Sequence, residues 1–471
     1  MTRTNSSRRN FLKRASLLAA GTALAACGPR TVVTPQDEPV APDSSQPEPD
    51  TSAPQGAAAG TVTYWVSWPE STYGKIWEEL KTKDEFKSLL GGANFELKPG
   101  VAEEAILTAV AGGTPPDGAS NFNYMDYMIR GVLSPIDSYI NASGQIKKED
   151  FLESVWDVGV YEGKNYGLPA NECFVQLGFC YNAKLVEDAG LDSNTPPETW
   201  DDLYAWHEKL TKFDDAGNVK VIGYNPTDFM GQTIWGSSAW DVSTSWGFEW
   251  YDEATGKFNL NNEGMVDYFN TSKKFVDLIG VDKLTAFSAV EGQGGWGPAF
   301  YSGVLASMLD GYWEPGELKG VNEEIHSNNR ASWLPVPASR KGTKAQGAGG
   351  HIVMIFKDAK NKDLMYKISE FLTTEPACDV IFKNVGWLPA RKSYLEQVDP
   401  KTYNGLDFFL KSAEEATYWG NVVKCPITTF VGVTYPQIRE QVYRGELTAA
   451  QAAEELQKRC EEELKNQGFA K

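Results

Sequence analysis

Histidines and cysteines, the side chains that most often perform chemistry, are few in this chain of 471 residues. His207 is followed by Glu208, but Thr211 stands where a zinc-binding helix would need its second histidine. With three histidines in all, and no zinc-like cysteine spacing, we expect neither a metal centre nor a cofactor. The sequence also lacks a G-x-S-x-G elbow and a P-loop, and a glycosidase pair cannot be picked out among 63 acidic residues. We therefore expect no enzyme and no catalytic residues.

The cysteines leave the pattern of disulfides open. If Cys27 is modified, as argued below, an odd number remains, so at least one stays unpaired within the chain. Two of them lie seven residues apart and would face opposite sides of one continuous strand, so we do not expect them to pair: Cys173 and Cys180. The pairing of the full set stays open: Cys173, Cys180, Cys378, Cys425 and Cys460.

The N-terminus has the features of an export signal. Residues 7–13 read SRRNFLK, a twin-arginine pattern, and the apolar stretch over 15–26 is too short to span a bilayer. It ends in LAAC at 24–27, which resembles the bacterial lipobox, whose cysteine thiol takes a diacylglyceryl group. A buried helix with an accidental arginine pair is the alternative. The order of the two signals favours removal of 1–26 and anchoring, through lipid on Cys27, to the outer face of the cytoplasmic membrane.

Residues 27–60 differ in composition from the rest of the chain. They are rich in Pro, Ala, Ser and acidic residues with almost no large apolar side chains, so they cannot bury enough surface to offset the entropy of ordering. We expect a disordered tether. The remaining body is longer than the chains that usually form a single hydrophobic core. Its length therefore favours two lobes.

The charge balance excludes one class of partner. Without the five basic residues of 1–26, the chain has 39 basic and 63 acidic residues, a formal charge of −24. A phosphate backbone demands the opposite sign, so we expect no nucleic acid. Two explanations of the negative charge stay open: an acidic surface that water solvates, or a cationic ligand. The 15 tryptophans exceed what cores usually use, and some should line a ligand site.

The body alternates short apolar runs with amphipathic helices, which indicates an α/β fold. We predict strands over 61–66, 175–181, 219–224 and 351–356, and one helix over 73–90. A second helix over 199–210 begins with a capping box of Thr199 and Asp202. The last helix begins at Thr448, capped with Gln451, and Gly468 can end it.

Seven segments together resemble the family 1 extracellular solute-binding proteins, the group that includes maltose-binding protein. They are the opening strand with Trp65, GGTPPD at 112–117, GVLSPI at 131–136, YEGKNYGLP at 161–169, YNAKL at 181–185 leading into PPETW at 196–200, FYSGVLASMLDGYW at 300–313 and GWLPAR at 386–391. Each segment is weak alone, but the seven occur in the family's order. The resemblance covers residues 61–468.

The resemblance implies a type II periplasmic-binding-protein fold with two lobes and a hinge. The first lobe would comprise 61–171 and 345–392, and the second 172–344 and 393–471. A ligand would bind in the cleft between the lobes, and the closed form would be recognised by the transmembrane permease subunits of an ABC importer. We expect a monomer.

The resemblance also implies which residues face the cleft. They follow the family's binding loops: Trp68, Glu70, Asn121, Asn123, Asn171, Glu172, Trp235, Trp240, Trp313, Trp387 and Arg391. Trp313 is expected to stack on the ligand because the family holds an aromatic residue at that turn. Trp65 lies inside the first strand and is assigned to the core.

The chemistry of these residues favours a carbohydrate, whose C–H face stacks on indole and whose hydroxyls need amides and carboxylates. Within the family, polyamines, glycerol phosphodiesters and iron are alternatives. A polyamine would suit Glu70, Glu172, Asp241 and the charge of −24, but not Arg391. Iron is disfavoured because no adjacent tyrosine pair occurs late in the chain. A lipoprotein glycoside hydrolase, or an adhesin that binds no small molecule, stays open from other classes.

Overall fold

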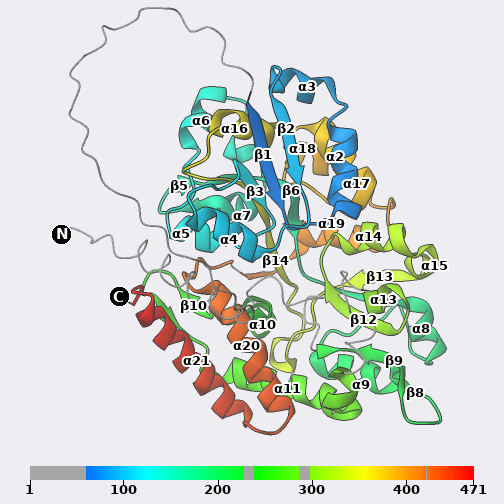
Figure 1. Cartoon of the computed structure of the whole chain (residues 1–471). Helices are drawn as coiled ribbons and strands as arrows, with labels where there is room; N and C mark the ends of the chain where they lie inside the picture. Colours follow the sequence, from blue (N-terminus) through cyan, green and yellow to red (C-terminus); the bar gives the residue numbers. More distant parts are fainter. Residues whose placement is uncertain (1–59, 227–237, 286–297, 421, 471) are drawn as a thin grey trace, which may run out of the picture.

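The computed structural model describes residues 60–226, 238–285, 298–420 and 422–470. The expected signal and lipidation segment, nearly all of the tether and Trp235 lie outside these residues. Within the described part of the chain, no helix is long and apolar enough to cross a membrane. The polypeptide forms two α/β lobes, drawn one above the other in Figure 1, so the expected fold class is confirmed.

The first lobe is built on a mixed sheet of order β15-β14-β3-β1-β2, with β6 pairing on β14. In strand β1, buried Val62, Tyr64 and Val66 alternate with less buried residues, of which Trp65 packs against a smaller apolar cluster on the opposite face of the sheet. The strands are β1 (Thr61–Val66), β2 (Asn94–Lys98), β3 (Gly118–Ser120), β4 (Val160–Tyr161), β5 (Lys164–Asn165), β6 (Gly167–Val175), β14 (Ala345–Ile355) and β15 (Tyr418–Gly420). The helices are α2 (Lys75–Leu80), α3 (Asp84–Leu90), α4 (Glu103–Ala111), α5 (Tyr124–Ile129), α6 (Asp137–Ser143), α7 (Glu153–Trp156), α16 (Lys362–Phe371), α17 (Glu375–Val385) and α18 (Lys392–Leu395).

The second lobe is built on a sheet of order β13-β7-β12-β9-β8. Its strands are β7 (Gly178–Asn182), β8 (Lys212–Phe213), β9 (Val219–Tyr224), β12 (Leu305–Asp310) and β13 (Asn329–Ser332), with a hairpin of β10 (Tyr251–Asp252) and β11 (Lys257–Phe258). Its helices are α8 (Ala183–Asp188), α9 (Trp200–Leu210), α10 (Ser238–Trp246), α11 (Glu263–Ile279), α13 (Pro298–Tyr301), α14 (Glu314–Val321), α15 (Glu323–Ser327), α19 (Leu406–Glu415), α20 (Thr428–Tyr443) and α21 (Ala449–Asn466).

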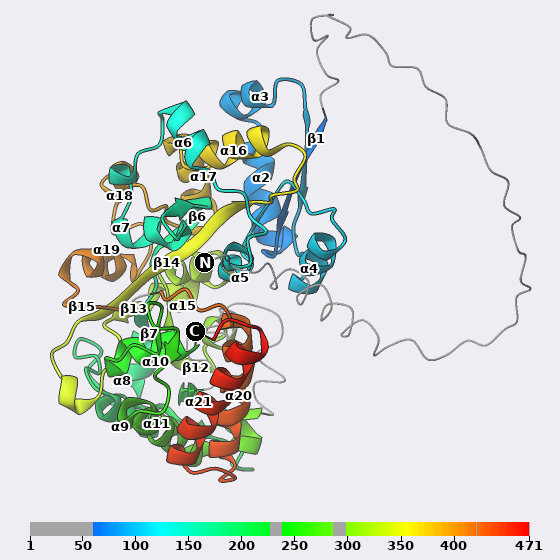
Figure 2. The ribbon, with the colours of Figure 1, turned by 90° about the vertical axis from the view of Figure 1, so that its left-hand side faces the viewer.

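Two long strands connect the lobes. β6 and β14 pair antiparallel, and every residue of both is buried. Figure 2 shows β14 running from one lobe toward the other. Gly350 has a φ of 148° at a register shift in this pair, and a Cβ there would collide with the Glu172 carbonyl oxygen, so glycine is required. The lobe boundaries expected above stay a prediction; β6 continues past 171 to Val175 before the chain enters the second sheet.

Four of the predicted elements are confirmed. The strands over 61–66 and 219–224 are β1 and β9 with the predicted bounds. The capping box of Thr199 and Asp202 begins α9, and that of Thr448 and Gln451 begins α21. The chain takes a positive φ at Gly468 after α21, as expected for a helix end.

Three predicted elements are wrong in extent. The helix over 73–90 is a helical turn over Glu70–Gly74 followed by α2 and α3, because Lys83 takes an extended conformation that lets Phe86 pack on Trp77. The strand over 175–181 is two strands, since the chain passes between the sheets at Gln176 and Leu177. The strand predicted over 351–356 begins earlier, at Ala345. Its first residues are rich in glycine, which is not typical of a strand, so the sequence did not indicate them.

Side-chain predictions outside the cleft have mixed outcomes. Trp65 is half-buried and packs against the smaller apolar cluster, with the Lys98 ammonium 4.3 Å from its ring. His207 is buried, accepts at Nδ1 from the Tyr224 amide at 3.0 Å and lies 3.1 Å from the Phe275 carbonyl through Nε2. Burial lowers the pKa of His207 to about 4, so it is a neutral structural histidine. The five described cysteines are buried free thiols.

Candidate functional site: a cavity between the lobes

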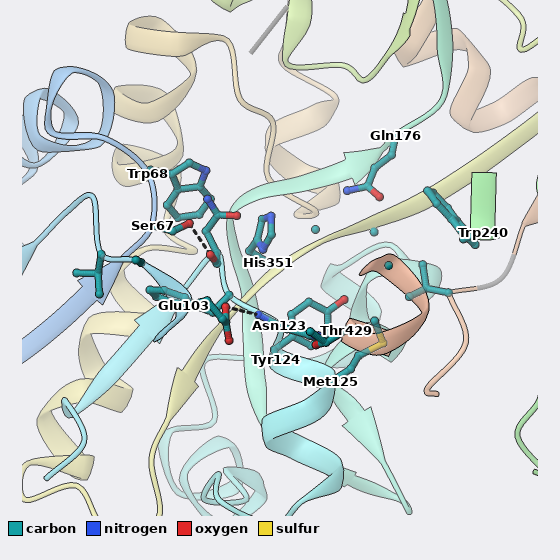
Figure 3. A pocket seen from close by; sticks show the side chains of 18 of the residues that line it. Ser67, Trp68, Glu103, Asn123, Tyr124, Met125, Gln176, Trp240, His351 and Thr429 are labelled. Carbon is teal, nitrogen blue, oxygen red and sulfur yellow. Dashed lines mark hydrogen bonds between the residues drawn. The ribbon is translucent and has the colours of Figure 1, made fainter. Parts of the chain in front are cut away.

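A cavity of about 540 Å³ lies between the lobes (Figure 3), within the size range of small-molecule sites. The loops after β1 and β3 form its first-lobe wall, as expected for sites at the carboxyl ends of parallel strands. The lining residues are Ser67, Trp68, Pro69, Gly100–Glu103 and Asn121–Met125 from the first lobe, Gln176 and Gly349–His351 from the crossing, and Trp240, Asp241, Trp313, Val422, Thr429, Gly432 and Val433 from the second lobe and its C-terminal segment.

Of the described tryptophans, three face this cavity, and they come from both lobes. Trp68 is held by Tyr73, Trp387 and His351, with ring centroids 4.8, 5.0 and 5.3 Å away. Trp240 lies against Gly347. A Cβ at position 347 would collide with the Trp240 ring, so only glycine leaves room for it. Trp313 packs on Tyr312 at 5.4 Å. Each indole is at most 5% exposed, so these rings are fixed surfaces for an apolar ligand face.

Amide groups supply polar contacts at the cavity wall. Asn121 takes a positive φ of 61°, and its carbonyl accepts from the Ser67 hydroxyl at 2.5 Å, which fixes the loop after β3. Gln176 lies where β6 ends, and Figure 3 shows its side chain beside the cavity. No hydrogen bond of the Gln176 side chain to another described residue is present, so its amide is available to a ligand. The sequence signal for Gln176 was its position as a polar residue within the apolar run CFVQLGFC.

Two carboxyl groups and no lysine or arginine line the cavity among the described residues. Burial raises the pKa of Asp241 well above its ordinary range. Burial also raises the pKa of Glu103, opposed by hydrogen bonds from the Tyr127 hydroxyl at 2.5 Å and the Asn123 amide at 3.4 Å. The undescribed segments 227–237 and 286–297 contain no lysine or arginine either. The cavity therefore does not suit an anionic ligand.

A buried pair supports the cavity from behind. His351 lines the cavity, and its Nε2 lies 3.3 Å from Glu172 Oε2, while the Tyr312 hydroxyl donates to Glu172 Oε1 at 2.9 Å. Burial lowers the pKa of His351 to about 3 and raises the pKa of Glu172. Desolvation thus favours the neutral form of both groups, so the pair braces the wall without placing a charge in it.

The structure brings together five of the eleven expected site residues: Trp68, Asn121, Asn123, Trp240 and Trp313 line the cavity. Trp235 lies outside the described residues. The other five lie elsewhere. Glu70 is exposed on the turn after β1. Glu172 lies behind His351, and Trp387 lies behind Trp68.

Asn171 and Arg391 are engaged with protein groups. Asn171 is buried and accepts from the Tyr73 hydroxyl at 2.7 Å. The Arg391 guanidinium donates to the Thr373 carbonyl at 3.1 Å and lies 3.9 Å from the Asp150 carboxylate. Sequence reasoning did not identify the lining residues Glu103, Gln176, His351 and Thr429. Among the described residues, no group of His, Cys, Asp or Glu could hold a metal ion.

Residues 68–377 match the model of the bacterial extracellular solute-binding proteins. The chain belongs to this family. The expected resemblance is therefore confirmed, and the family comprises solute-binding proteins that are exported. A relative of similar sequence is a binding protein of Brucella abortus (strain 2308), 24% identical over 369 residues, covering 77% of this chain and 82% of the relative.

Solved structures share the fold of this solute-binding protein. CpMnBP1 with mannobiose bound has a TM-score of 0.72 at 22% identity, with 85% of this chain and all of that chain covered. The maltose/maltodextrin-binding domain MalE from Bdellovibrio bacteriovorus, bound to maltotriose, has a TM-score of 0.66 at 17% identity, with 86% and 100% covered. At these identities the similarity shows the fold alone.

Proposed function

We propose that this protein captures a neutral sugar or short oligosaccharide in the cavity between its lobes and delivers it to the permease of an ABC importer. The observation that carries the proposal is the lining itself. Indoles from both lobes offer stacking surfaces, amides and carboxyls offer hydrogen bonds, and no described lining residue is cationic. CpMnBP1 and MalE, which share the fold, have mannobiose and maltotriose bound, and this supports the same ligand class.

A polyamine is the second candidate because one observation favours it. Asp241 is 5% exposed, faces the cavity and makes no hydrogen bond or ion pair with another described residue. A ligand ammonium group would compensate a buried carboxylate, and the rings would pack on the methylene chain. A sugar hydroxyl would instead donate to the same group.

A thermal-shift screen separates the two candidates. Mannobiose, maltotriose, glucose, putrescine and spermidine would each be added to the protein, and binding to the native state alone raises Tm in proportion to RT ln(1 + [L]/Kd). At a ligand concentration of about 100 Kd the stabilisation is about 2.7 kcal/mol. We expect a sugar to raise Tm and the polyamines not to. A shift with spermidine alone would replace the sugar proposal by the second candidate.

We also propose that the protein is a monomer held at the outer face of the cytoplasmic membrane by lipid on Cys27, with 27–60 as a tether. The twin-arginine and lipobox patterns support this proposal. Cys27→Ser should release the protein from the membrane fraction. Retention of the Cys27→Ser protein after a high-salt wash would contradict the lipid anchor.

A further inference from the structure

The two lobes touch along one edge of the cavity, where α5 of the first lobe contacts α20 of the second. Asn123 precedes α5 and donates from Nδ2 to Thr429 Oγ1, and Figure 3 shows the two side chains next to each other. The Thr429 hydroxyl in turn donates to Asp126 Oδ2 at 2.9 Å. We name this contact the outer seam; it consists of Asn123, Asp126 and Arg130 facing Pro426, Thr429 and Gln467.

The direction of these hydrogen bonds sets the orientation of one amide. Thr429 has a single hydroxyl proton, and it is directed to Asp126, so its oxygen accepts from Asn123. This pairing places the Asn123 nitrogen, Nδ2, toward Thr429. The other atom of the amide is therefore the carbonyl oxygen, Oδ1, which points away from Thr429. Within the described part of the chain, no hydrogen bond to Asn123 Oδ1 is made, so this oxygen keeps its capacity to accept from a ligand.

We propose that Thr429 and Asp126 are positioning residues: with Asn123 they form a latch that assembles only when the lobes meet, and the latch orients the Asn123 amide at the cavity wall for a ligand hydroxyl. The nature of the ligand rests on the proposed function, whereas the closing of the lobes through this contact does not depend on it. Asn123 and Asp126 belong to the first lobe and Thr429 to the second, so opening the lobes breaks the relay.

Arg130 strengthens the same contact beside the latch. Its Nη2 donates to Gln467 Oε1 at 2.6 Å and to the Pro426 carbonyl at 3.4 Å. Its guanidinium lies 5.5 Å from the Phe469 ring. The outer seam therefore connects α5 to the start of α20 and to the end of α21. These two helices lie about 300 residues after α5 in the sequence.

Asp126 makes the latch sensitive to pH. Burial raises the pKa of Asp126 from its ordinary 3.8 to about 6, against the lowering effects of the Arg130 charge and the Thr429 hydrogen bond. The other titratable groups that face it are Glu103 of α4, Tyr127 of α5 and Cys425 before α20.

The sign of this dependence follows from linkage. When the lobes open, α20 no longer covers Asp126, so we expect its pKa to move back toward the ordinary value and the closed form to bind the proton more tightly. Protonation therefore favours closure. The stabilisation of the closed form by protonated Asp126 is complete below the ordinary pKa of 3.8, and it is lost as the pH rises through about 6.

The test measures closure without ligand. Spin labels at Asp84→Cys on α3 and Asp201→Cys on α9 report the distance between the lobes, because these side chains are 100% and 78% exposed. The full chain carries Cys27→Ser, so the labels are the exposed thiols, since the other described cysteines are buried. Pulsed electron paramagnetic resonance then compares Thr429→Val, which removes the hydroxyl, with Thr429→Ser, which keeps it.

We expect Thr429→Val to lengthen the mean distance and Thr429→Ser to match the wild type. Moving from pH 7.5 to 5.0 should shorten the wild-type distance, whereas Asp126→Asn, which mimics the protonated acid, should not respond. A Thr429→Val distribution equal to that of the wild type overturns the latch. A pH response that persists in Asp126→Asn overturns the role of Asp126.

Ligand affinity provides the second readout, with mannobiose as the probe. Thr429→Val should weaken binding by roughly 2- to 10-fold, the range for one hydrogen bond, and Thr429→Ser should restore it. If the wild type binds no sugar while Thr429→Val still opens the lobes, the proposed function fails and the latch stands. If sugar binds equally to all three proteins and their distances agree, the latch fails alone.

Discussion

Two contacts between the described parts of the lobes differ in chemistry. The inner seam consists of Tyr312, Gly316 and Glu317 against Gly386, Trp387 and Leu388. Trp387 Nε1 donates to Glu317 at 2.8 Å, and the Tyr312 hydroxyl, which donates to Glu172, also lies 3.2 Å from the Leu388 carbonyl oxygen. It is mostly buried and closely packed, whereas the outer seam consists of partly exposed polar groups.

This difference indicates which of the two contacts persists and which one breaks when the lobes open. Separating the inner seam would expose indole and backbone surface and leave buried polar groups unpaired, which costs much more than parting groups that water can satisfy. Water can replace the partners of Asn123 and Arg130 at the outer seam. We therefore expect the lobes to open at the outer seam and to pivot about the inner seam with β6 and β14, with the cavity between them.

The largest effect on binding is expected where the cavity meets its ligand. Trp313→Ala removes an indole from the cavity wall; the ring is 2% exposed, so little area is available for burial, and we expect the loss of one aromatic contact, about 0.5–1.5 kcal/mol. This corresponds to roughly 2- to 10-fold in Kd for a sugar, measured by calorimetry. Trp313→Phe retains a ring and should lose less. If Trp313→Ala is folded and binds as tightly as the wild type, the second-lobe wall is wrongly assigned.

The largest effect on stability is expected at the inner seam. A Cβ on Gly316 would lie 2.5 Å from Gly386 Cα and 2.6 Å from the Val385 carbonyl oxygen, so Gly316→Ala should destabilise the fold by about 1–3 kcal/mol. Gly320 lies in the same helix with nothing within 4 Å, and Gly320→Ala should stabilise by up to about 1 kcal/mol. Urea unfolding measures both. Equal effects of the two substitutions would show that the seam is not closely packed.

The smallest effect is expected from titration of the inner seam. Burial raises the pKa of Glu317 from 4.5 to about 8, opposed by the Trp387 hydrogen bond. The stability that the protonated form contributes is complete below pH 4.5 and is lost as the pH rises to about 8, above which both states are ionised, so Tm should fall between pH 6 and 8 and then level off. Glu317→Gln should flatten this fall. A wild-type Tm that is constant up to pH 9 would argue against the buried carboxyl.

The sequence predicted the fold class because its seven ordered segments are spread over both lobes, and because helix caps and strand β1 are local signals. It did not predict the passage at Gln176 and Leu177, since an apolar run looks the same whether or not the chain changes sheets. The glycine-rich start of β14 was hidden for a physical reason: those glycines make room for Trp240 and Gln176, which no local pattern reveals.

For the site, the sequence could place loops but not side-chain directions. Trp68 and Trp387 were expected to act alike, yet only Trp68 lines the cavity, and Trp387 packs behind it toward Glu317. Thr429 could not have been found, because it reaches the cavity only through the packing of α20 on α5, about 300 residues away in sequence.

The most direct test of a neutral ligand held by indoles is the salt dependence of binding. Wild-type protein would be titrated with the sugar that raises its Tm, at about 0.05 M and about 0.5 M NaCl, where the screening length falls several-fold. We predict that Kd changes by less than about twofold, because a neutral ligand has no charge to screen. A loss of affinity of tenfold or more at high salt would show that charge-assisted contacts carry the binding and that the ligand is not neutral.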